Sequence, residues 1–217
     1  RQVWAIVGFT VVVEALGAAS LYAFAPADQD RLARLGWSVF HAVSAFCNAG
    51  FALQADSLTA LQDSPGAMLT FMGLIVVGGL GFLVVTDLLG LQLSRLPGLR
   101  RIPWVSRYNQ RVPVYRIPVQ TRLSAVVSAL LILAGLTGFW VLEAGHSLAD
   151  QPFLTQFWVS LFQSVTARTA GFNTVAIDHL HPATLLLLIA LMVVGACPVS
   201  TGGGIKTVTL AVLLLAL

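Results

Sequence analysis

Two short motifs carry the residues best suited to handling an ion. One is Asn48-Ala49-Gly50-Phe51 and the other is Thr169-Ala170-Gly171-Phe172. Glycine has no side chain to block a passage and tolerates unusual backbone angles. Backbone carbonyls in such a stretch can replace the hydration shell of a cation, and the phenylalanine can wedge outward to hold the strand. A plain loop that closes a helical hairpin is the alternative explanation.

Each motif follows an apolar segment that is too short to cross a bilayer. These segments, 37–46 and 157–167, have ten and eleven residues, whereas a spanning helix needs about 20. We therefore predict re-entrant helices, which enter the membrane and return to the same side. The carboxyl end of a helix carries about half a negative charge, which favours a cation beside the motif that follows.

Four longer apolar runs surround these segments, at 3–24, 67–93, 123–142 and 183–217. The last run has 35 residues and is too long for one straight crossing. Proline and consecutive glycines interrupt it, so we predict a broken span whose loop lines a wet cavity. A phosphate-binding loop is rejected because Ile205 separates glycine from lysine. The candidate loop residues, within 195–206, are Gly195, Cys197, Pro198, Ser200, Thr201, Gly202, Gly203, Gly204 and Lys206.

The order of span, short helix and span occurs twice, and the residue types agree. The stretch SVFHAVSAFCNAGF at 38–51 aligns with SLFQSVTARTAGF at 160–172 when one residue is skipped. We predict an internal duplication. Residues 1–93 and 123–217 then form two span–pore-helix–span repeats, and residues 94–122 form the loop between them.

The composition is that of a membrane protein. Hydrophobic residues make up 57% and charged residues 10% of the chain, against about 25% charged residues in soluble proteins. This excludes an ordinary soluble enzyme, a disordered tail and a nucleic-acid-binding module. Because a basic short loop marks the cytoplasmic side, we place both short helices at the outer face. The basic residues in question are Arg95, Arg100, Arg101, Arg107, Arg111, Arg116 and Arg122.

Two charged residues inside apolar segments are candidates for a role near the motifs. Arg168 directly precedes the second motif, and Glu14 lies in the middle of the first long run. Ionisable residues within a membrane are costly and usually functional. We expect Arg168 to brace the second motif by pairing with a carboxylate, and Glu14 is a possible partner.

Three stretches resemble the potassium-uptake superfamily of Trk, Ktr and plant HKT transporters, and look closest to the Ktr membrane (KtrB-type) subunit. They are SAFCNAGF, SVTARTAGFNT, and STGGGIKT after a broken span. The resemblance implies an all-α membrane protein with four non-identical repeats around a pseudo-fourfold, potassium-channel-like pore. This chain would hold the second and third repeats, with one filter glycine each, Gly50 and Gly171, and a gate at 195–206. Val199 stands where the family usually has glycine, and we expect it to stiffen the loop.

The same resemblance implies potassium uptake by the ion-conducting subunit of a multi-pass protein in a bacterial cell membrane. The permeating ion would be K⁺, and Na⁺ is a candidate co-required ion. The intact protein would be a homodimer docked on a ring of cytosolic nucleotide-binding regulatory subunits of the KtrA/TrkA type. The Arg-rich loop is a candidate for that docking face or for contact with anionic lipids.

Two other functions stay open. One is a sodium-selective or mixed monovalent cation conductor of the same fold, and the other is a non-conducting membrane scaffold. No nucleophile, base or cofactor motif points to an enzyme, so we expect no catalysis, no organic cofactor and no nucleic-acid partner. Both ends of the chain fall in apolar runs, and we therefore expect a fragment of a longer protein.

Overall fold

The computed structural model describes residues 2–95 and 117–216. Within them every regular element is a helix, apart from one isolated β-bridge. The all-α prediction is therefore confirmed. The elements are α1 (Gln2–Leu21), α2 (Arg31–Phe46), η1 (Thr59–Leu61), α3 (Pro65–Arg95), α5 (Val119–Glu143), α6 (Phe153–Thr166), η3 (Ile177–His179), α7 (Pro182–Val193) and α8 (Thr207–Ala216).

Among the described residues, three helices are long and apolar enough to cross a membrane. They lie in α1, α3 and α5, over Val3–Leu21, Pro65–Gly90 and Val119–Glu143. The fourth apolar run is broken as predicted, because α7 ends at Val193 and α8 begins only at Thr207. Five arginines of the predicted cytoplasmic loop (Arg100, Arg101, Arg107, Arg111 and Arg116) lie outside the described residues.

The two short helices begin earlier than the apolar segments suggested. The first, α2, starts at Arg31 because Asp30 caps it, accepting a 2.8 Å hydrogen bond from the amide of Ala33. The second, α6, starts at Phe153, directly after Pro152. Both remain shorter than a spanning helix, with 16 and 14 residues, as the re-entrant prediction requires.

Helix α3 differs from the prediction of an unbroken span. Gly81 has φ 78° and ψ 160°, and the helix kinks there. This region of backbone space is open essentially to glycine alone. The kink frees carbonyl groups that would otherwise bond within the helix, and these must find other partners in a membrane.

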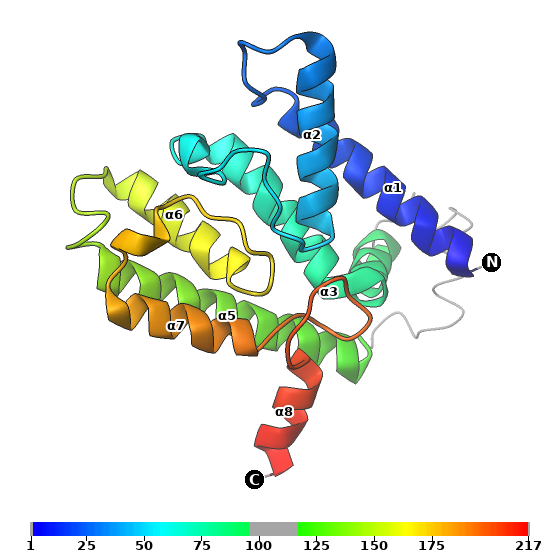
Figure 1. Cartoon of the computed structure of the whole chain (residues 1–217). Helices are drawn as coiled ribbons and strands as arrows, with labels where there is room; N and C mark the ends of the chain where they lie inside the picture. Colours follow the sequence, from blue (N-terminus) through cyan, green and yellow to red (C-terminus); the bar gives the residue numbers. More distant parts are fainter. Residues whose placement is uncertain (1, 96–116, 217) are drawn as a thin grey trace.

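Helix α3 runs through the middle of the molecule, with α1 and α2 to one side and α5, α6 and α7 to the other (Figure 1). One hydrophobic cluster joins both repeats, since it contains residues of α1, α2 and α3 together with Phe162 and Phe172. Phe71 of α3 meets Phe172 with ring centroids 5.3 Å apart. A second cluster, around Phe139, lies between α5, α6 and α7. The core therefore brings the segments that follow α2 and α6 close together.

Candidate functional site

The two glycine motifs have matching backbone conformations. We call residues 48–51 and 169–172 the candidate filter segments. In the first, Asn48 and Gly50 have φ of 52° and 71°, and in the second, Thr169 and Gly171 have φ of 74° and 90°. Positive φ is uncommon for residues other than glycine. When such angles alternate along a strand, successive carbonyl groups can point to the same side, which is the arrangement that cation coordination needs.

The two candidate filter segments lie directly against one another. A Cβ atom placed on Gly50 would lie 2.3 Å from the carbonyl oxygen of Ala170 and 2.9 Å from Cα of Gly171. A Cβ atom placed on Gly171 would meet only Cα of Gly50, at 3.6 Å. The fold therefore needs glycine at position 50 both for its backbone angles and for this close approach.

Hydrogen bonds tie the first segment to its own helix and join the two repeats just beyond the segments. Ser44 of α2 donates its hydroxyl to the carbonyl of Phe51 at 2.8 Å. Between the repeats, the amide of Leu58 donates to the carbonyl of Asn173 at 2.9 Å, and the amide of Asn173 donates to the hydroxyl of Ser57 at 3.0 Å. Phe172 is buried, whereas Phe51 is 68% exposed, and the wedge role of the two phenylalanines stays a prediction.

Residues 195–206, the candidate gate loop, begin and end side by side. The two ends are joined by the parallel bridge between Val194 and Ile205, and the amide of Gly195 donates to the carbonyl of Ile205 at 3.1 Å. Inside the loop, Lys206 donates its ammonium group to the carbonyl of Gly202 at 2.6 Å. The sole lysine of the chain therefore stabilises the loop itself.

The candidate gate loop donates hydrogen bonds to carbonyl groups of α3 that lie just before its kink. The amide of Cys197 donates to the carbonyl of Gly79 at 2.9 Å, and the amide of Thr201 donates to the carbonyl of Gly78 at 3.3 Å. A Cβ atom on Gly81 would lie 2.5 Å from the carbonyl oxygen of Val199. These three glycines of α3 were not among the predicted site residues, although their clustering in the sequence was the available signal. The loop that interrupts the fourth apolar run thus supplies donors to the carbonyl groups at the kink of α3.

The same loop also contacts both candidate filter segments. Asn48 donates its side-chain amide to the hydroxyl of Thr201 at 2.9 Å, and that hydroxyl donates to the carbonyl of Phe46 at 2.8 Å. On the other repeat, the amide of Gly203 donates to the hydroxyl of Thr169 at 3.2 Å. A movement of the loop would break contacts with both segments at once.

Arg168 follows the carboxyl end of α6, where a positive charge is favourable. It is 8% exposed, and its Nη2 donates to the hydroxyl of Ser128 at 3.0 Å and to the carbonyl of Gly195 at 3.4 Å. The suggested pairing with Glu14 is wrong, because no hydrogen bond or ion pair joins Arg168 to a carboxylate within the described ranges. Arg168 instead connects α6 to α5 and to the start of the candidate gate loop.

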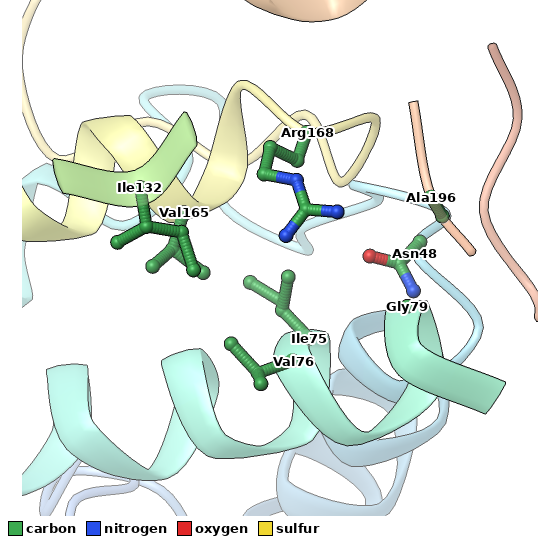
Figure 2. Close-up of a pocket in the computed structure, with 8 residues that line it drawn as sticks. All are labelled: Asn48, Ile75, Val76, Gly79, Ile132, Val165, Arg168 and Ala196. Carbon is green, nitrogen blue, oxygen red and sulfur yellow. The ribbon is translucent and has the colours of Figure 1, made fainter. Parts of the chain in front are cut away.

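A small cavity lies between Arg168 and Asn48, against one face of α3. Its volume is about 10 Å³, which is close to the least that a single water molecule needs. Figure 2 shows the guanidinium of Arg168 and the amide of Asn48 converging on this space, with Ile75 and Val76 below. Cys197 is buried nearby and lies 3.5 Å from the hydroxyls of Ser128 and Thr207. Polar groups of both repeats therefore meet around one cavity.

Val199 and Gly204 both have left-handed backbone in the candidate gate loop, with φ of 58° and 72°. A β-branched residue in this region is an outlier, so Val199 is strained in a position that glycine would adopt freely. The stiffening expected from Val199 stays a prediction.

Comparison with known proteins decides which family has this architecture. The family model described as TrkH, a cation transport protein, matches residues 2–217. The chain belongs to the TrkH cation transport protein family. The resemblance to the Trk and Ktr systems is thereby confirmed. Together with the three long apolar helices, it makes this a multi-pass protein of the cell membrane.

Individual relatives agree with this assignment. The Ktr system potassium uptake protein B of Vibrio alginolyticus is 36% identical over 100% of this chain, and the potassium/sodium uptake protein NtpJ of Enterococcus hirae is 34% identical over 97% of it. This TrkH-family chain spans only 44% and 42% of their lengths. The crystal structure of the potassium transporter TrkH from Vibrio parahaemolyticus has the same fold, with a TM-score of 0.70 and 20% identity over 99% of this chain and 40% of that one. These relatives are named as transport proteins and not as enzymes.

Proposed function

We propose that the full-length protein moves K⁺ across the cell membrane through a filter to which this chain contributes two segments, residues 48–51 and 169–172. The observation that carries the proposal is the matched left-handed backbone at Asn48 and Thr169 and at Gly50 and Gly171. Each segment follows the carboxyl end of a short helix, whose dipole favours a cation. Similarity to potassium uptake proteins supports K⁺ as the permeating ion. Ion passage is passive and involves no catalytic step.

We also propose that residues 195–206 gate this passage. The loop bonds to both filter segments and to the kink of α3, so its position and the shape of the filter are coupled. Backbone that leaves helical geometry inside a membrane is stable only where its polar groups find partners or water. The loop has such partners in its present position, and its opening requires exchanging them for water or an ion.

The partners of the full-length protein are part of the same proposal. Similarity to Ktr membrane subunits suggests a homodimer that docks on a ring of cytosolic nucleotide-binding subunits of the KtrA/TrkA type. The present chain is then the second and third of four repeats, with residues 94–122 as the connecting cytoplasmic loop.

A sodium-selective or mixed conductor is the second candidate. It is favoured by similarity to the Enterococcus hirae protein named as a potassium/sodium uptake protein. Both filter positions visible in this chain are glycine, which is the reason to place K⁺ first. Whether Na⁺ is a co-required ion belongs to the same question.

The test is rubidium uptake by cells that lack their own potassium uptake and that express the full-length parent. Wild type is compared with Gly171→Ser and with Gly145→Ser, a matched control at a glycine without neighbours within 4 Å. Membrane expression is measured for all three, and Na⁺ is added as a competitor. We expect uptake by wild type and control, and lost or Na⁺-inhibited uptake by Gly171→Ser.

The outcomes separate the candidates. Unchanged uptake by Gly171→Ser contradicts the filter assignment. Absence of rubidium uptake by an expressed wild type contradicts potassium conduction, and sodium influx in its place supports the second candidate. Absence of both fluxes leaves only a non-conducting membrane protein.

A further inference from the structure

The two short helices hold a polar side chain at the same place behind each candidate filter segment. The alignment of the repeats sets His41 of α2 opposite Gln163 of α6. Both side chains are buried, with 0% and 1% exposure. The Nε2 of His41 accepts a hydrogen bond from the amide of Leu53 at 3.4 Å, and the Nε2 of Gln163 donates to the hydroxyl of Thr174 at 3.4 Å. Leu53 and Thr174 are each the third residue after a filter glycine, so in both repeats a side chain of the short helix bonds to the segment that follows the filter glycine.

The hydrogen bonds of His41 determine its protonation state. Its Nδ1 lies 2.8 Å from the carbonyl oxygen of Trp37. A carbonyl can only accept, so Nδ1 carries the proton. The amide of Leu53 can only donate, so Nε2 must offer a lone pair. Both contacts exist together only in the neutral imidazole with its proton on Nδ1. A second proton on the ring would occupy the lone pair of Nε2, so that two N–H groups would face each other and the hydrogen bond from Leu53 would be lost.

The surroundings of His41 are aromatic and uncharged. The rings of Trp37, Phe40 and Phe71 lie with centroids 4.2, 5.4 and 6.0 Å from the imidazole. In the described part of the chain, no charged or titratable side chain of α2, α3 or residues 51–55 contacts it. Arg34 lies about two turns earlier in α2, and its guanidinium donates to the carbonyl of Tyr22 instead. Burial among these rings therefore favours the neutral imidazole.

We propose that His41 is a positioning residue that holds the first filter segment only while its imidazole is neutral, so that conduction falls when His41 gains a proton. The second repeat has Gln163 at this place and does not share the dependence, because an amide does not titrate. The inference rests on the proposed potassium conduction. It predicts that conduction depends on pH through the first repeat alone and that a single substitution at His41 removes this dependence.

The variant His41→Gln copies the second repeat. A glutamine at position 41 can accept from the amide of Leu53 and donate to the carbonyl of Trp37 without titrating. The matched control is His179→Gln, since that histidine is 77% exposed. The swap variant His41→Gln/Gln163→His carries the titratable group to the other repeat.

The experiment measures rubidium flux into proteoliposomes that contain the full-length parent, with the same pH on both sides. Flux at about pH 5 is divided by flux at about pH 7.5, a range that brackets histidine titration. For wild type and His179→Gln we expect a ratio well below one, with about a tenfold loss for each pH unit below the pKa of His41. For His41→Gln we expect a ratio near one, and for the swap variant a ratio again below one.

A second measurement does not depend on the variants. Hydrogen exchange of residues 51–55 in the wild-type protein is compared with that of residues 172–176 in the same sample. On acidification, protection of the first segment should fall relative to the second.

Each result bears on the inference. A wild-type flux ratio near one overturns it, as does a His41→Gln ratio equal to that of wild type, or an equal change of exchange in both segments. Absence of wild-type flux at both pH values contradicts the proposed conduction instead. A relative loss of protection in residues 51–55 would still support the positioning role of His41.

Discussion

Replacing Gly50 or Gly171 by alanine tests how closely the two candidate filter segments approach one another. Both positions have left-handed backbone, with φ of 71° and 90°. The new methyl groups meet different surroundings. At position 50 the Cβ atom would lie 2.3 Å from the carbonyl oxygen of Ala170, whereas at position 171 it would meet only Cα of Gly50, at 3.6 Å. We therefore expect Gly50→Ala to be the more damaging change.

The expected difference follows from two contributions. The left-handed backbone costs an alanine about 1–2 kcal/mol at either position. At position 50 the two segments must also move apart, and overpacking of this kind costs about 1–3 kcal/mol more. The destabilisation is then about 2–5 kcal/mol for Gly50→Ala and about 1–2 kcal/mol for Gly171→Ala. Since about 1.4 kcal/mol is a tenfold change in an equilibrium constant, the two variants should be clearly distinguishable.

The assay is the thermal unfolding midpoint of the purified full-length parent, together with rubidium uptake at matched expression. Both quantities should fall further for Gly50→Ala than for Gly171→Ala. The control is Gly8→Ala in α1, where a methyl group meets nothing within 4 Å and alanine favours the helix. An equal or larger loss of stability for Gly171→Ala would show that the segments do not approach as closely as described, and would refute the reasoning.

Three further changes test the contacts around the site. Thr201→Val removes the closer of the two acceptors of the Asn48 side-chain amide and leaves only the carbonyl of Phe46, at 3.4 Å. Loss of this hydrogen bond costs about 0.5–1.5 kcal/mol, so we expect a looser gate loop and a higher basal rubidium leak. Glu143→Gln replaces one of two accepting oxygens by an amide donor, whereas the carboxylate accepts on both sides, from the amide of His181 at 2.9 Å and from that of Ser147 at 3.3 Å; one of these donors then faces another donor, and the unfolding midpoint should fall by several degrees. Val199→Gly should raise the midpoint slightly, because relief of about 1–2 kcal/mol of backbone strain exceeds the about 0.4–1 kcal/mol that glycine adds to the freedom of the unfolded chain.

Each of these changes has a control and a contradicting outcome. Thr137→Val is the control for Thr201→Val, because the Thr137 hydroxyl donates to carbonyls of its own helix. An equal rubidium leak in both variants would contradict the role of Thr201. Asp178→Asn, at an exposed carboxylate, is the control for Glu143→Gln and should leave the thermal unfolding midpoint unchanged. A lower midpoint for Val199→Gly would mean that packing of the valine outweighs its strain.

Local signals in the sequence predict the positions of most elements. Apolar run length predicted the three spanning helices, and the glycine motifs predicted where the chain leaves helical geometry after α2 and α6. Proline and glycine predicted the break between α7 and α8. The helix starts were less accurate, because the cap at Asp30 and the residue after Pro152 begin the helices, not the first apolar residue.

The sequence by itself determined the duplicated order of span, short helix and span, since hydropathy, run length and repeated motifs are properties of neighbouring residues. Only the tertiary structure decided which distant groups meet. It gives Arg168 the hydroxyl of Ser128 and the carbonyl of Gly195 as partners in place of Glu14, and it joins the candidate gate loop to the carbonyls freed at the kink of α3. Backbone polar groups in a membrane must find partners, but the pattern of the chain does not show which partners the packing of its helices permits.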